Sequence, residues 1–160
     1  MNKSGLLKQI LCMLELVHQN ACTATARAKD TATNKNNVAE NKYDTLGLEA
    51  AYLAHGQAQR VVECQRDLAE FKKMKAIDFT DQSPIAPGAL IELKDENGEE
   101  KHLFLGPAAG GLKFCFEQKQ ILIVTPSAPL GKAMLGCLVS DELDVNIGGK
   151  NTHYEIMAVR

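Results

Sequence analysis

The sequence predicts an α+β protein, in which an antiparallel helical hairpin precedes a small antiparallel β-sheet domain with one short helix. Apolar residues recur at helical spacing in the first half, whereas short β-like runs separated by turn residues fill the second half. Between the two patterns stand the cationic residues 72–75 and the turn-rich residues 81–88, which mark a domain boundary. We therefore expect a hairpin at residues 1–76, a linker at 77–88 and a second domain at 89–160.

The first predicted helix starts at Ser4, its expected N-cap, and carries Leu7, Ile10 and Leu14 on one apolar stripe. The pattern then fades into small and polar residues. Residues 29–43 contain almost nothing to bury, so they are expected to form a loop or a frayed helix end.

The second predicted helix runs from about residue 45 to residue 74, where helical periodicity resumes. Neither helix has an apolar face wide enough to form a core alone. Packed antiparallel, the two would cover each other's stripes as a coiled coil. The polar tip of this hairpin is expected at about residues 29–44.

The second half is expected to fold as five or six strands with one helix. That helix lies within residues 125–137, with Pro129 suited to its first turn and Gly136 to its end. The glycine-rich residues 106–111 lack the lysine of a phosphate-binding loop, so they are expected to connect two strands. The expected strands are 89–94, 101–105, 112–116, 120–124 and a terminal hairpin with Leu143, Val145 and Ile147 on one strand and Tyr154, Ile156 and Ala158 on the other.

Composition and charge limit the classes of function. The 160 residues are 45% apolar and 24% charged, as in soluble globular proteins, and the net charge of -2 provides no overall basic field for nucleic acid or an anionic membrane. Five scattered cysteines without zinc-ligand spacing favour free thiols in a reducing cytoplasm. The apolar run at residues 6–17 is too short to cross a bilayer, so we expect a cytoplasmic protein without a membrane partner.

A familiar pattern lies in the second half. Residues 123–136 read Ile-Val-Thr-Pro-Ser-Ala-Pro-Leu-Gly-Lys-Ala-Met-Leu-Gly, residues 140–145 read Ser-Asp-Glu-Leu-Asp-Val, and residues 152–159 read Thr-His-Tyr-Glu-Ile-Met-Ala-Val. These segments resemble the C-terminal domain of the bacterial Gre transcript-cleavage factor family. A long helical hairpin in front of such a domain is that family's architecture, so the resemblance covers nearly the whole chain.

The resemblance implies an FKBP-like second domain that binds bacterial RNA polymerase, and a coiled coil that enters the polymerase secondary channel. Acids at the hairpin tip would help to hold a second Mg²⁺, so that the polymerase itself cleaves backtracked RNA near the 3′ end of the nascent transcript. The protein would be an accessory factor and not an enzyme. The resemblance places Ser127, Pro129 and Lys132 on the polymerase-docking surface.

The tip departs from the family pattern Asp-x-x-Glu-Asn-x-x-Tyr. Here Asn37 stands in the position of the first acid, and the tyrosine comes one residue early. Asp44 could substitute for the missing acid, because Glu40 and Asp44 would share a helix face at i and i+4. The candidate metal-binding acids are therefore Glu40 and Asp44, with Glu49 as a further acid that could aid them.

Two other interpretations stay open. A tip degraded at Asn37 would give a regulator that occupies the channel without promoting cleavage. Alternatively, the apolar stripes would serve a coiled-coil interaction module that pairs with another protein or with itself, whereas a channel-entering hairpin is expected to be monomeric. The four histidines show no triad or metal-ligand spacing, so no autonomous enzyme site is expected.

Overall fold

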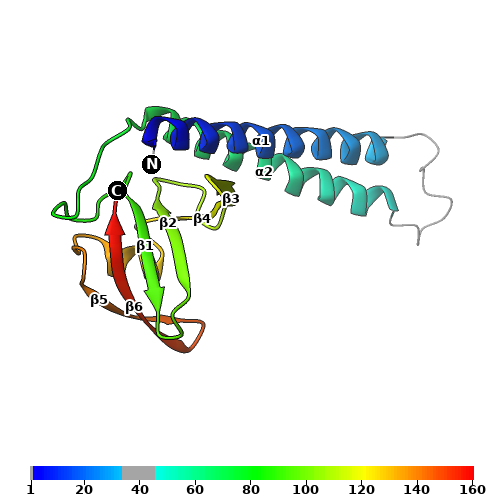
Figure 1. The fold of residues 1–160 in the computed structure, drawn as a ribbon. Helices are drawn as coiled ribbons and strands as arrows, with labels where there is room; N and C mark the ends of the chain where they lie inside the picture. The colour runs from blue at the N-terminus through cyan, green and yellow to red at the C-terminus, as the bar shows by residue number, and fades with distance from the viewer. Residues whose placement is uncertain (1, 34–45) are drawn as a thin grey trace. The chain divides into compact units, whose positions relative to one another are not determined.

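The computed structural model describes residues 2–33 and 46–160 (Figure 1). Residues 12–69 form one compact unit, and residues 1–11 together with 70–160 form a second. None of the described helices combines the length and apolar character needed to cross a membrane. The elements are α1 (Lys3–Thr33), α2 (Leu46–Lys73), β1 (Leu90–Asp95), β2 (Glu100–Leu105), β3 (Lys113–Phe116), β4 (Lys119–Val124), α3 (Pro129–Met134), β5 (Glu142–Ile147) and β6 (Lys150–Val159).

Helix α1 begins one residue before the predicted cap. The side-chain oxygen of Asn2 accepts a hydrogen bond from the backbone N–H of Gly5 at 3.0 Å, so Asn2 caps the helix. Ser4 already lies inside the helix, and its prediction as the N-cap is wrong. The physical reason is that an asparagine oxygen two residues upstream reaches the free N–H groups of the first turn.

Helix α1 also ends later than expected, at Thr33, inside the predicted polar tip. The hydroxyls of Thr31 and Thr33 donate hydrogen bonds to the carbonyls four residues earlier, at 3.0 and 2.9 Å. These polar side chains are therefore satisfied by their own helix. A segment with nothing to bury can still be helical when its polar groups find backbone partners nearby.

The unit of residues 12–69 contains most of the two helices and has a narrow core. Its buried apolar residues are mostly small. They are Leu14, Ala21, Ala28, Ala50 and Cys64.

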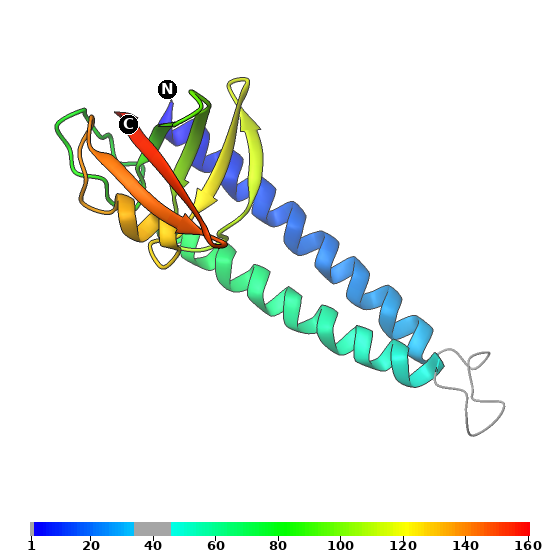
Figure 2. The same ribbon diagram turned by 90° about the horizontal axis from the view of Figure 1, so that it is seen from below.

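The six strands form one sheet in the order β3-β4-β2-β1-β6-β5 (Figure 2). All neighbouring pairs are antiparallel, as predicted, except β2 and β4, which run parallel with His102 opposite Ile121. The connection explains the exception. The chain leaves β2, forms the edge strand β3, and turns back as β4 between β3 and β2, so β4 must point the same way as β2.

Buried side chains lie on both faces of the sheet. On one face, a cluster that includes Leu93, Leu103 and Ile156 packs with Met134 of α3, and all four side chains are at most 2% exposed. On the other face, Phe104 stacks on Phe71 from the last turn of α2, with ring centroids 6.3 Å apart. The ends of the helices thus belong to the core of the sheet unit.

Candidate docking surface

The three predicted partner-binding residues lie at the start of α3 and are all exposed. Pro129 is the first helical residue, as predicted, where its fixed φ suits the helix and its missing N–H costs nothing. Ser127 does not cap the helix. Its hydroxyl instead lies 2.9 Å from the hydroxyl of Thr125, and the N-cap residue is Ala128 without a side-chain cap. Ser127, Pro129 and Lys132 are therefore presented to solvent from one short segment.

Gly131 explains how this segment is held. A Cβ atom at this position would collide with the backbone carbonyl of Thr125, so only glycine lets the helix pack this closely on the preceding loop. The backbone N–H of Lys132 donates to the carbonyl of Ala128 at 2.8 Å, and Met134 anchors the helix in the core. The exposed side chains consequently stand on a rigid base.

An apolar hollow of about 250 Å³ lies beside Pro129. A hollow with so few polar groups is suited to receive an apolar side chain from a partner. Its lining residues are Gly110, Gly111, Leu122, Ile123, Val124, Thr125, Ala128, Pro129 and Leu130.

A larger, half-open groove of about 610 Å³ borders the hollow. Leu122 and Leu130 line both spaces, so the groove and the hollow form one continuous surface. The other groove residues are Glu100, Lys101, His102, Leu103, Lys113, Gln118, Lys119, Gln120 and Tyr154.

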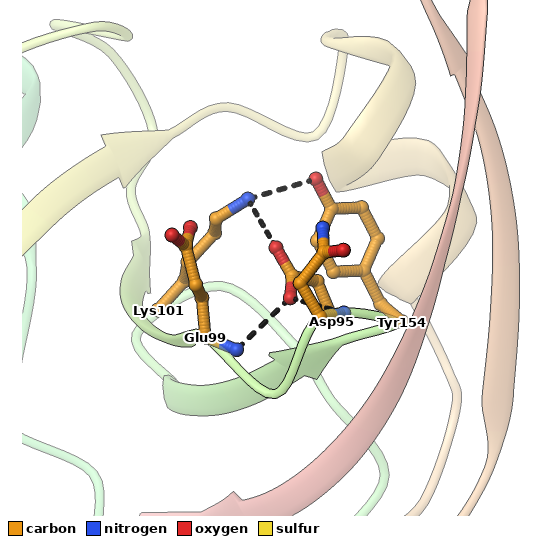
Figure 3. Close-up of polar contacts among 5 residues, drawn as sticks. Asp95, Glu99, Lys101 and Tyr154 are labelled. Carbon is orange, nitrogen blue, oxygen red and sulfur yellow. Dashed lines mark hydrogen bonds and ion pairs between the residues drawn. The ribbon is translucent and has the colours of Figure 1, made fainter.

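A polar network holds one side of this groove (Figure 3). The ammonium group of Lys101 lies 3.3 Å from the carboxylate of Asp95 and 3.3 Å from the hydroxyl of Tyr154. The backbone N–H of Glu99 donates to Asp95 at 2.9 Å and is the main reason that the pKa of Asp95 is lowered. Burial opposes the charge of Lys101, but Tyr154 and Asp95 outweigh it and raise the pKa of Lys101. Both groups are thus charged at neutral pH.

Sequence reasoning missed this network. Asp95 falls between the predicted strands 89–94 and 101–105, and an aspartate at the start of a turn is a signal for side-chain bonds to the turn's backbone N–H groups. Lys101 and Tyr154, however, lie 53 residues apart. They meet because β1 pairs with both β2 and β6, and no local pattern gives that register.

The predicted tip acids Glu40 and Asp44, like Asn37, lie outside the described residues. Glu49 lies in the first turn of α2 and is exposed. Within residues 2–33 and 46–160, no three His, Cys, Asp or Glu side chains gather as a metal site. The metal-binding prediction for the tip stays a prediction.

The fold and this surface define a two-part protein, a helical hairpin joined to a β-sheet domain with a hollowed outer face. No family model matches the chain. Two curated relatives, each named transcription elongation factor GreA, come from Sinorhizobium medicae and Rhizobium meliloti. Each is 31% identical in an alignment of 122 residues, with 72% of this chain and 72% of the relative covered. The chain therefore belongs to the GreA family, which confirms the resemblance and the predicted fold class.

Solved structures of the same family are also similar to the chain. GreA factor homolog 1 (Gfh1) of Thermus thermophilus is 19% identical, with 98% of this chain and 93% of that chain covered and a TM-score of 0.38. A GreA/GreB elongation factor from Nitrosomonas europaea is 20% identical, with 70% of this chain and 91% of that chain covered and a TM-score of 0.36.

Proposed function

We propose that the protein is a transcription elongation factor that binds bacterial RNA polymerase at its secondary channel and stimulates the polymerase's own cleavage of backtracked RNA. The observation that carries this proposal is the 31% identity to two GreA factors over 72% of the chain. In this proposal the protein is an accessory factor, and the polymerase active site carries out the cleavage.

Two features of the described residues support the proposal. Helix α1 has 31 residues and therefore spans about 46 Å, a length suited to reaching into a channel. The exposed segment at Ser127, Pro129 and Lys132, beside an apolar hollow, offers a place to hold the polymerase from outside. We propose that the sheet domain docks and that the hairpin delivers its tip.

Glu40 and Asp44 are proposed to hold Mg²⁺ shared with the polymerase. Carboxylate oxygens are the protein ligands that Mg²⁺ prefers, so the donor chemistry fits this ion. When bound, the metal would activate the attacking water and neutralise charge that develops on the phosphate. The protein's own part is to supply two anionic oxygen ligands.

A second candidate function rests on Asn37. An amide at this position supplies a neutral oxygen where relatives of the cleavage type carry an acid, which weakens the attraction for a divalent cation. The protein would then occupy the secondary channel and regulate the polymerase without stimulating cleavage.

The deciding experiment measures RNA cleavage in stalled, backtracked elongation complexes with Mg²⁺, with and without the purified protein. Faster release of short 3′ fragments supports the cleavage factor. The double variant Glu40→Ala, Asp44→Ala is then expected to abolish the acceleration, whereas Glu63→Ala, in an exposed ion pair with Arg60, is a control that should keep it. Full activity of the double variant would remove both acids from the mechanism.

The variant Asn37→Asp distinguishes the two candidates. If the wild-type protein binds polymerase without accelerating cleavage, restoring the acid should produce cleavage activity, because it returns an anionic ligand to the tip. If the wild-type protein binds polymerase without stimulating cleavage, and Asn37→Asp still does not stimulate it, the result would favour a regulator whose role does not depend on metal.

Docking is tested with Pro129→Arg, which places a long cation at the rim of the apolar hollow. We expect weaker binding to core polymerase. Met157→Arg is the matched control, because Met157 is 45% exposed on β6 and outside the lining of the hollow. Equal binding by the two variants would count against this docking surface.

A further inference from the structure

Helix α2 has two rows of regularly spaced residues on opposite faces. The residues of the first row are all buried or half-buried: Ala50, Ala54, Gln57, Val61, Cys64 and Leu68. The residues of the second row are all exposed: Leu48, Tyr52, His55, Gln59, Val62 and Arg66. In both rows the intervals alternate between three and four residues, which is the spacing of a coiled-coil seam. Helix α2 therefore has a buried seam and an open seam.

The open seam presents large apolar side chains to solvent. Leu48, Tyr52 and Val62 are 58%, 70% and 65% exposed. Single exposed apolar residues are common on protein surfaces. Three of them in coiled-coil register on one helix face form a stripe that another helix can cover. The open seam is thus suited to pairing with a helix.

The open seam is complementary to itself in reverse order, because its six positions lie symmetrically about residue 57. A second, antiparallel copy of α2 would place Tyr52 opposite Val62 of that copy, in an apolar layer. It would place His55 opposite Gln59 of that copy, where the two side chains can form a hydrogen bond. A two-fold axis repeats both layers, so each copy offers the same surface to the other.

The ends of the open seam are complementary in charge. In the antiparallel arrangement, Arg66 lies against Leu48 of the second copy and beside Glu49 of that copy. The leucine packs on the aliphatic stem of the arginine, and the guanidinium reaches the carboxylate. A parallel arrangement would place Arg66 against Arg66 of the second copy, which brings two like charges together. Charge therefore favours the antiparallel arrangement.

We propose that a second copy of this chain covers the open seam, through antiparallel pairing of the two α2 helices. Only three apolar residues of each copy contribute, so the pairing is weak, with a dissociation constant on the order of 0.1 mM. The pairing covers one face of the hairpin and lowers the amount of free monomer at high protein concentration. It is a property of the isolated protein, so its failure leaves the proposed function intact.

Sedimentation equilibrium of the purified full-length protein from about 0.01 to about 1 mM tests the proposal, and the wild type should pass from monomer to dimer. Tyr52→Glu places a charge in the seam and should weaken the dimer by more than about tenfold. Leu53→Glu is the matched control, because Leu53 is 56% exposed on α2 outside the seam, and it should stay within about twofold of the wild type. A wild type that stays monomeric, or equal effects of the two variants, would overturn the proposal.

Exchange of the charges at the ends of the seam tests the antiparallel direction. At low salt, Arg66→Glu should weaken the dimer by about threefold, since it places two carboxylates at each end. The double variant Arg66→Glu, Glu49→Arg reverses both charges and should recover the affinity of the wild type. The single variant Glu49→Arg completes the cycle, so that the effect of each residue within its own chain is subtracted. A double variant that pairs no more tightly than Arg66→Glu would overturn the antiparallel arrangement.

Discussion

The two units of the molecule bury very different side chains. Residues 12–69 bury mainly alanines, together with Leu14 and Cys64, and leave Tyr52 and Val62 70% and 65% exposed. The sheet unit encloses Phe71, Phe104 and a continuous aliphatic cluster, most of it almost without exposure. Since burial of apolar area contributes about 25 cal/mol per Å², small buried residues stabilise much less than large ones.

This difference in buried residues indicates that the two units contribute unequally to the stability of the protein. A hairpin with a narrow core depends on helix propensity and is expected at the low end of local stability, whereas the sheet unit sets the global stability. The helix ends lie in the sheet unit, as the contact between Phe71 and Phe104 shows. The last turn of α2 thus belongs to the core of the sheet unit.

The largest expected effect comes from Phe104→Ala. Phe104 is 0% exposed and stacks on Phe71, so its loss removes a large buried ring and the anchor of α2. We expect the free energy of unfolding to fall by about 3–5 kcal/mol, measured by urea denaturation.

The control for this variant is Tyr52→Ala on the hairpin. Tyr52 is 70% exposed, so its removal should change the free energy of unfolding by less than about 0.5 kcal/mol. Comparable losses from the two aromatic residues would contradict the division of stability between the units.

A smaller effect is expected from pH, through Lys3 at the start of α1. Its ammonium group donates to the carbonyl of Gly88 at 2.6 Å and lies 4.7 Å from the ring centroid of Phe79. Burial lowers the pKa of Lys3 from 10.5 to about 8, against the attraction of Asp78. Between these two pH values the unfolded chain holds a proton that the folded protein has released.

The unfolding free energy should therefore rise with pH from about 8 to 10.5. Below about 8 the cost of burying the charged Lys3 is fully present and does not change with pH. We expect a gain on the order of 2 kcal/mol, since solvent near the helix start screens part of the effect. Denaturation at pH 7 and pH 10 measures it, and Lys3→Met should lose this component. A wild-type gain retained in full by Lys3→Met would assign it to another group.

Most of the fold could be predicted from the sequence because its signals are local. Period-2 alternation, turn residues and Pro129 located the strands and α3 within one or two residues. The pairing of β4 beside β2 could not be predicted, since it depends on the path of the chain through β3 and on contacts between distant segments. The end of α1 was misplaced because the bonds of Thr31 and Thr33 to their own helix leave no apolar pattern.

The candidate site also has a part that could be predicted from the sequence and a part that could not. The exposed segment at Ser127, Pro129 and Lys132 could be named from a sequence motif, since those residues lie close together along the chain. The groove could not, because Lys101, Lys113 and Tyr154 come from three strands and face one space only after the sheet has formed. A sequence motif identifies residues that are close along the chain, whereas the lining of the groove depends on the register of the strands.

The smallest expected effect lies in the hairpin and tests whether the two units open separately. Ala28 is buried in α1, and Ala28→Gly removes a methyl group from the narrow core as well as about 1 kcal/mol of helix propensity. Ala26 is exposed in the same helix, so Ala26→Gly carries the propensity loss alone.

Amide hydrogen exchange measures both variants. Ala26→Gly should speed exchange across residues 12–33 and 46–69 by about fivefold, and Ala28→Gly by somewhat more than tenfold. The amides of β1, β2 and β4 should keep their wild-type rates, because their protection is set by the larger core of the sheet unit. If amide exchange in the sheet speeds up as much as exchange in the hairpin, the two units unfold together. The stability of the hairpin would then depend on the sheet unit and not on its own small buried residues.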